Sequence, residues 1–159
     1  MIVVADTSPI NYLILIDRIA ILEVLYGRIL IPHAVHDEML SSKAPPGVRA
    51  WARNPPGWLE LLSPSTGLHP PVARLDRGET EAIALAEELR ADWLLIDEAA
   101  GRDEAAKRGL QTIGTLGILR EGHRAGMLDF RASMDRLLAS GFRIDQSLIQ
   151  LVLDSIYRP

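Results

Sequence analysis

The stretch Ile2-Val3-Val4-Ala5-Asp6-Thr7-Ser8-Pro9 decides the fold. Residues 2–5 form a short apolar run rich in β-branched side chains, which is typical of a buried strand in a parallel sheet. The run ends in a carboxylate and two hydroxyls, and ligands of open α/β proteins bind at the carboxyl ends of strands. Ser8 followed by Pro9 is also a helix-start signal. The stretch therefore allows two interpretations, a ligand site or a simple helix cap made by Asp6 or Ser8.

Strands and helices alternate from residue 93 to residue 125, which predicts an α/β fold with a parallel sheet. The proline-rich residues 41–77 are predicted to be the least regular part. Strands are expected at residues 2–5, 29–31, 58–62, 93–96 and 110–113. Helices are expected at residues 12–16, 19–25, 32–40, 48–53, 78–89, 99–108, 114–125, 129–139 and 145–157.

Length and composition indicate one ordinary globular domain over residues 1–159, with 48% hydrophobic residues and no cysteine. The absence of cysteine excludes disulfides and thiolate metal sites and fits a cytoplasmic location. No apolar run reaches the roughly 20 residues of a membrane span, and no basic stretch precedes the first apolar run, so neither membrane insertion nor a signal peptide is expected. The net charge of −4 argues against tight non-specific binding of nucleic acid through bulk charge. It leaves room for a local basic rim or a basic partner.

Four acidic residues stand out by their positions, namely Asp6, Glu38, Glu79 and Asp97. Asp6 and Asp97 each end a predicted strand, and Glu79 lies in the first turn of a predicted helix. Because strand ends and the following helix starts of a parallel sheet share one edge, these three carboxylates are expected to face one cleft. Glu38 lies at the edge of the buried face of its helix. Each acid alone also has a plainer interpretation, as a cap, a turn residue, a charge near a helix N-terminus or a solvated side chain.

Taken together, the four acids predict a metal site. Carboxylates that share a site repel one another and cannot all ionise without a cation. Oxygen ligands favour Mg²⁺ or Mn²⁺, and such an ion suits phosphodiester hydrolysis. Glu79 falls near the apolar stripe of its helix and Glu81 to the other side, so Glu79 is the expected ligand and an assisting role for Glu81 stays open. His33 and His36 lack a third ligand nearby and are predicted to lie on the surface.

Contacts to a substrate are expected beside these acids. Thr7 and Ser8 are placed to hydrogen-bond a metal-bound water or a phosphate. Basic residues after the fourth acid are candidates for phosphate contacts at a rim, with solvated helix faces as the alternative. These candidates are Arg102, Lys107, Arg108, Arg120 and Arg124.

In these motifs the sequence resembles the PIN-domain proteins, the metal-dependent nucleases that include the toxins of many prokaryotic toxin–antitoxin pairs. The resemblance covers nearly the whole chain and is loosest in residues 41–77. The segments that carry it, in order, are residues 3–9, 31–38, 78–86 and 94–98 with Gly101-Arg102 after them.

The resemblance implies a three-layer α/β/α sandwich with a central parallel sheet and an acidic pocket for one or two Mg²⁺ or Mn²⁺ ions. Matching positions make Asp6, Glu38, Glu79 and Asp97 the catalytic metal-binding acids. The third acid is usually Asp in the toxins and here is Glu79. The fourth motif usually has Thr shortly before its Asp and here reads Ile96-Asp97-Glu98, so either Asp97 or Glu98 is the fourth ligand.

The family further implies an endoribonuclease acting on RNA, a cognate antitoxin protein as partner, and a homodimer. Tyr12, Leu13 and Ile16 are candidates for a dimer patch and equally for the core. A second hypothesis is a catalytically weak PIN-like module that acts through protein or RNA contacts. A phosphatase with Asp6 as nucleophile is disfavoured, because that chemistry usually needs a second Asp where Ser8 stands.

Overall fold

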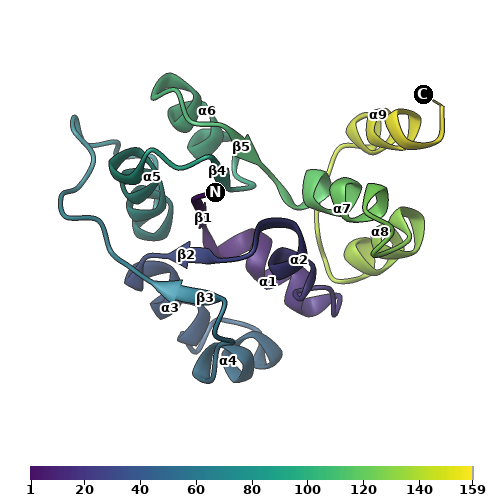
Figure 1. Cartoon of the computed structure of the whole chain (residues 1–159), viewed down its shortest axis with the longest axis horizontal. Helices are drawn as coiled ribbons and strands as arrows, with labels where there is room; N and C mark the ends of the chain where they lie inside the picture. Colours follow the sequence, from purple (N-terminus) through teal and green to yellow (C-terminus); the bar gives the residue numbers. More distant parts are fainter. Residues whose placement is uncertain (159) are drawn as a thin grey trace.

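A five-stranded parallel sheet forms the centre of the computed structural model, which describes residues 1–158 (Figure 1). Residue 159, part of the predicted domain, lies outside the described residues. The strand order is β3-β2-β1-β4-β5, and helices cover both faces, so the predicted α/β/α sandwich is confirmed. The strands are β1 (Val3–Ala5), β2 (Ile29–Ile31), β3 (Leu59–Leu61), β4 (Trp93–Leu95) and β5 (Thr112–Ile113).

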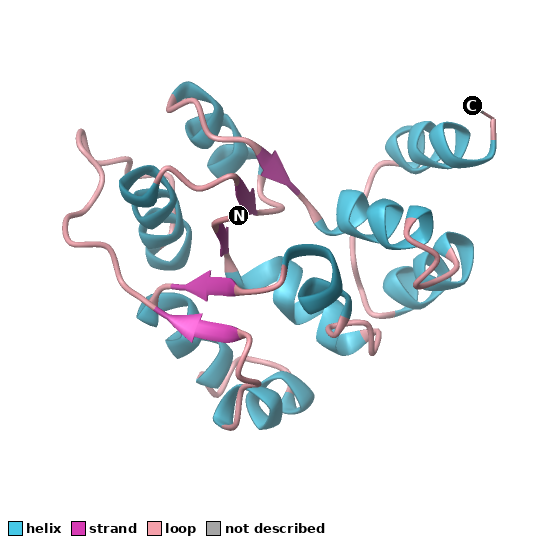
Figure 2. Ribbon diagram, in the orientation of Figure 1, coloured by secondary structure: helices cyan, strands magenta, loops and turns pink. Residues whose placement is uncertain are grey.

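The first helix begins five residues earlier than predicted, and the other helices lie close to their predicted positions. Figure 2 shows the helices in cyan. They are α1 (Thr7–Leu15), α2 (Ile21–Tyr26), α3 (His33–Leu40), α4 (Pro46–Arg53), α5 (Arg77–Leu89), α6 (Ala99–Lys107), α7 (Thr115–Arg124), α8 (Phe130–Ala139) and α9 (Gln146–Tyr157). The interpretation of Ser8 as the cap of the first helix is wrong, because α1 already begins at Thr7 and Asp6 is its N-cap residue. Pro9 is tolerated inside the first turn because backbone N–H groups there have no partner within the helix. No helix within residues 1–158 is long and apolar enough to cross a lipid bilayer.

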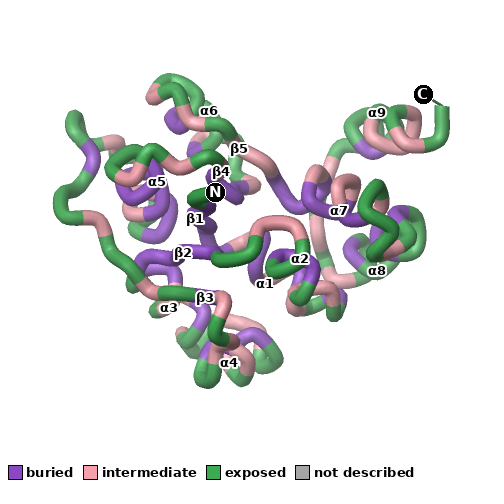
Figure 3. Tube along the Cα trace, viewed as in Figure 1, coloured by how far each residue is buried: buried purple, intermediate pink, exposed green. Residues whose placement is uncertain are grey.

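Two hydrophobic cores lie on opposite faces of the sheet, since successive side chains of a strand alternate between faces. Val3 and Ala5 of β1 belong to one core together with buried residues of α1, α3, α4, α7 and α8. Val4 belongs to the other core, which α5 and α6 cover. Figure 3 shows β1 buried along its whole length at the centre of the molecule. The residues that follow β1 therefore enter a site enclosed by helices from both layers.

Candidate active site

Asp6 is the most deeply buried acid at the carboxyl edge of the sheet, with 3% of its surface exposed. Its backbone N–H donates to the Leu95 carbonyl at 2.9 Å, which ties the end of β1 to β4. Its Oδ1 atom is buried and accepts no hydrogen bond. Burial raises the pKa of Asp6 from 3.8 to about 8; the Thr7 backbone amide opposes the rise, and nearby carboxylates reinforce it. Those neighbours are Asp76, Glu38 and Glu79.

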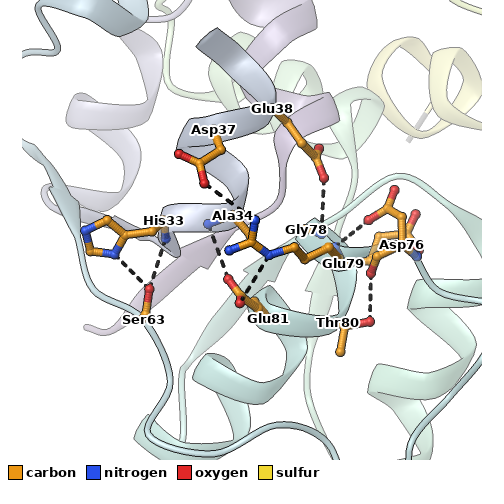
Figure 4. A network of polar contacts seen from close by, with 11 residues as sticks. His33, Ala34, Asp37, Glu38, Ser63, Asp76, Gly78, Glu79, Thr80 and Glu81 are labelled. Atoms are coloured by element: carbon orange, nitrogen blue, oxygen red, sulfur yellow. Dashed lines mark hydrogen bonds and ion pairs between the residues drawn. The ribbon is translucent and has the colours of Figure 1, made fainter. Parts of the chain in front are cut away.

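Glu38 of α3 is held in this region by two hydrogen bonds from distant segments. Thr7 Oγ1 donates to Glu38 Oε2 at 2.6 Å. The Gly78 backbone N–H donates to Glu38 Oε1 at 3.1 Å (Figure 4). A Cβ atom added at residue 78 would collide with Glu38 Oε1. Gly78 thus lets the first turn of α5 approach α3 closely enough to hold this carboxylate.

Glu79 is positioned by a capping box at the start of α5. Its backbone N–H donates to Asp76 Oδ1 at 2.8 Å, and the Asp76 backbone N–H donates to Glu79 Oε2 at 3.4 Å. Glu79 is 6% exposed, and burial followed by the charge of Asp76 raises its pKa. Sequence reasoning missed Asp76 as a member of the site. The signal was present, because an Asp three residues before a Glu at the start of an apolar stripe is a capping-box pattern.

Glu81 lies on the other side of α5 and does not share the surroundings of Glu79. Its Oε2 accepts a hydrogen bond from the Ala34 backbone N–H at 3.3 Å, and its Oε1 lies 3.7 Å from Arg77 (Figure 4). Arg77 also pairs with Asp37 at 3.6 Å, so this side of α5 fastens the helix to α3. An assisting role for Glu81 at Glu79 finds no support in this arrangement.

The two neighbouring histidines serve the fold around α3. His33 is exposed as predicted, and its Nδ1 lies 2.8 Å from Ser63 Oγ. His36 is half-buried rather than on the surface, because its Nε2 lies 2.9 Å from the Ala52 carbonyl oxygen and links α3 to α4.

Asp97 follows the end of β4, and both of its carboxylate oxygens accept hydrogen bonds. Its Oδ1 accepts from the Thr115 backbone N–H and its Oδ2 from Thr115 Oγ1, both at 2.7 Å, so it joins the end of β4 to the start of α7. Burial raises the pKa of Asp97, while Thr115 and Arg102 lower it and Glu98 raises it. Glu98 also raises the pKa of Glu79, so its charge acts on both parts of the site.

We call Asp6, Glu38, Asp76 and Glu79 the carboxylate cluster. The charges of Asp76, Glu38 and Glu79 all raise the pKa of Asp6. Within residues 1–158, no three His, Asp or Glu side chains are arranged so that they could hold a metal ion. A single ion bound by all four predicted acids therefore stays a prediction. In its chemistry the cluster suits a hard cation, because it combines a buried, unpartnered carboxylate oxygen with further carboxylates.

The basic residues predicted for the rim have different surroundings in the structure. Arg102 and Arg120 line a groove beside Asp97. The prediction for Arg108 is wrong, because its side chain is 10% exposed and pairs with Glu104 at 3.0 Å and Glu87 at 3.1 Å. Arg124 pairs with Glu121 at 3.2 Å. Lys107 is exposed in the last turn of α6.

The predicted residues of α1 lie in three different places: against Glu38, in the groove and in the core. Thr7 is buried against Glu38, whereas Ser8 lines the groove. Leu13 and Ile16 belong to the core, so a dimer patch at these positions is wrong. Tyr12 packs edge-on against Phe142, with ring centroids 4.7 Å apart.

Comparisons with known proteins agree with this architecture. A family model described as PIN domain matches residues 2–158. A solved structure of a PilT N-terminus domain protein from the hyperthermophilic archaeon Sulfolobus solfataricus P2 is similar, with 21% identity and a TM-score of 0.56. That similarity covers 81% of this chain and 95% of the other, and it supports the fold alone. No curated protein matches the chain. PIN domains are generally nucleases. The family match spans almost the whole sequence, and the chain therefore belongs to the PIN-domain family.

Proposed function

We propose that this protein is a Mg²⁺- or Mn²⁺-dependent endoribonuclease that hydrolyses RNA phosphodiester bonds. The observation that carries the proposal is the buried, unpartnered Oδ1 of Asp6 within the carboxylate cluster. Burying carboxylates side by side is costly unless a cation compensates their charge. An enzyme that binds a divalent ion there would use this otherwise unfavourable arrangement for catalysis.

In this proposal Asp6, Glu38 and Glu79 would hold the ion after their side chains turn toward one another, with Asp97 or Glu98 as the fourth acid. A bound ion would supply a Lewis acid and a more acidic water. Thr7 and Gly78 keep the Glu38 carboxylate oriented through the hydrogen bonds at 2.6 and 3.1 Å. Asp76 keeps Glu79 oriented through the capping box.

Metal binding and cleavage by the Asp6→Asn variant test the proposal. The wild type should gain thermal stability with Mn²⁺, cleave single-stranded RNA, and lose cleavage in EDTA. Asp6→Asn should lose the Mn²⁺-dependent gain and at least about 100-fold in cleavage rate, because several kcal/mol of transition-state stabilisation depend on the ion. Asp135→Asn, which changes an exposed Asp on α8, is the matched control and should behave like the wild type. Equal Mn²⁺ response and cleavage in Asp6→Asn would contradict the proposal.

The occupied oxygens of Asp97 favour a second candidate function, a catalytically weak PIN-domain module that acts through RNA or protein contacts. The same assay separates the two candidates. A wild type that binds RNA but cleaves no faster than Asp6→Asn would support the weak module.

The more specific role proposed is that of the toxin of a toxin–antitoxin pair, with an antitoxin partner and a homodimer. This part of the proposal rests on the sequence resemblance alone. Overexpression of the wild type in bacteria should arrest growth, and overexpression of Asp6→Asn to the same protein level should not. Normal growth with the wild type would contradict the toxin role and leave the nuclease proposal untouched.

A further inference from the structure

A groove of about 750 Å³ opens beside Asp97. Its lining comes from α1, the β4–α6 connection, the start of α6, β5, α7, the α8–α9 connection and α9. Figure 1 labels these elements. We propose that this groove binds the single-stranded RNA segment that flanks the scissile phosphate. The inference rests on the proposed nuclease function and assigns a path for its substrate.

Positive charge in the groove comes from three separate elements. Arg102 projects from α6, Arg120 from α7 and Arg143 from the α8–α9 connection. Within residues 1–158, Arg102 and Arg143 are exposed and form no ion pair. Arg120 forms an ion pair with Glu121, whose Oε1 lies 3.4 Å from the buried Arg120 Nε, and this Nε makes no hydrogen bond. In a chain with a net charge of −4, the free guanidiniums of Arg102 and Arg143 are a local exception that suits an anionic strand, while Asp97 and Glu98 supply the negative charge of the same groove.

The groove also presents flat apolar surfaces between these charges. The half-buried rings of Tyr12 and Phe142 meet at 90° with centroids 4.7 Å apart, and both line the groove. Ile113 and Ile144 add aliphatic surface. Arginines beside aromatic rings are the usual composition of single-strand binding grooves, where phosphates contact the cations and bases contact the rings.

The groove also holds acids of the proposed site. Ser8, Asp97 and Glu98 line it, and Ser8 follows Thr7, which holds Glu38. A strand bound along the arginines would therefore reach Asp97 and Glu98, one of which is the proposed fourth acid. The groove volume falls in the range of about 300–1,000 Å³ of pockets for compact ligands, whereas double-stranded-RNA-binding domains contact about 16 base pairs. These dimensions favour an unpaired strand.

Binding of a labelled single-stranded RNA tests the groove. Fluorescence anisotropy with a strand of about ten nucleotides suits the site sizes of such grooves. Binding is measured with the wild type in EDTA and with Asp6→Asn, because the RNA should stay uncleaved under both conditions. Arg143→Ala and Arg102→Ala should each weaken binding about 5- to 10-fold and lower the salt slope by about one. Phe142→Leu should weaken binding without changing the salt slope, since it removes a ring and no charge.

Arg53→Ala and Arg136→Ala are the controls, because both residues are exposed and lie outside the groove. They should change binding less than twofold. Groove variants that bind like these controls, or a duplex of the same sequence that binds as tightly as the single strand, would overturn the inference. If the protein cleaves RNA but the groove variants bind RNA like the wild type, the groove inference fails and the nuclease proposal stands. If binding depends on the groove arginines but the protein shows no Mn²⁺-dependent cleavage, the nuclease proposal fails and the groove inference stands.

Discussion

At the scale of single residues, Asp6 combines a functional position with a cost in stability. Its pKa is about 8 in the folded protein and 3.8 as an ordinary carboxyl. Between these two pH values the folded state keeps a proton that the unfolded state has lost, so this group makes stability fall as the pH rises through the window. Near pH 7, roughly three pH units above the ordinary pKa, the penalty is on the order of 4 kcal/mol at about 1.4 kcal/mol per pKa unit.

Asp6→Asn should therefore raise the melting temperature in EDTA by several degrees near pH 8 and hardly at all near pH 3, where the Asp6 carboxyl of the wild type is mostly protonated in both states. Thermal unfolding across this pH range measures the difference. Glu79 and Asp97, whose pKa values are also raised, keep part of the slope in the variant. Asp135→Asn should leave the pH dependence unchanged. A variant that loses stability more strongly at high pH would show that the Asp6 carboxylate is stabilised in the fold.

Gly78 permits a different test, because it contacts Glu38 through backbone alone. Gly78→Ala should push Glu38 aside and weaken Mn²⁺ binding about 10-fold, the usual effect of losing a hydrogen bond to a metal ligand. The free energy of unfolding in EDTA should change little, because the preference of a helix for alanine over glycine, about 1 kcal/mol, offsets the cost of displacing Glu38. Mn²⁺ titration followed by thermal shift measures both quantities.

Gly57→Ala is the control for Gly78→Ala, because a Cβ at residue 57 meets nothing within 4 Å. An unchanged Mn²⁺ midpoint in Gly78→Ala would remove Gly78 from the positioning of Glu38.

At the scale of elements, Asp97 and Thr115 fasten α7 to the end of β4. Thr115 is fully buried and supplies both hydrogen-bond donors to the Asp97 carboxylate. Thr115→Val removes the hydroxyl donor and keeps the shape, so it should cost about 1–3 kcal/mol of unfolding free energy. The pKa of Asp97 should rise further, because this hydroxyl lowers it. Chemical denaturation measures the first effect and NMR titration of Asp97 the second.

Thr115→Ser keeps the hydroxyl and should retain most of that stability and the pKa of Asp97. If Thr115→Val proved as stable as Thr115→Ser, the hydrogen bond to Oδ2 would contribute nothing at this junction.

At the scale of the whole molecule, the sequence predicted the fold closely and the site in part. The apolar runs and helix stripes gave all five strands and the parallel sheet, because burial dictates both patterns. The positions of Asp6 and Glu79 followed from the sheet edge. The hydrogen bonds that occupy Asp97 did not, because Thr115, which donates them, lies eighteen residues away in the sequence. Arg143 and Phe142 were equally hidden, since only tertiary packing brings the α8–α9 connection to α1.

The central place of β1 has a consequence for biosynthesis. Val4 pairs with Leu30 on one side, and Val3 pairs with Trp93 on the other. Strand β1 therefore gains its second neighbour, β4, only about ninety residues later in the chain. Contacts between residues that are distant in sequence form slowly. Glu38 likewise reaches its final position only when Thr7 and Gly78 are both present. A ribosome making this proposed ribonuclease would thus carry an inert chain until β4 has left the exit tunnel.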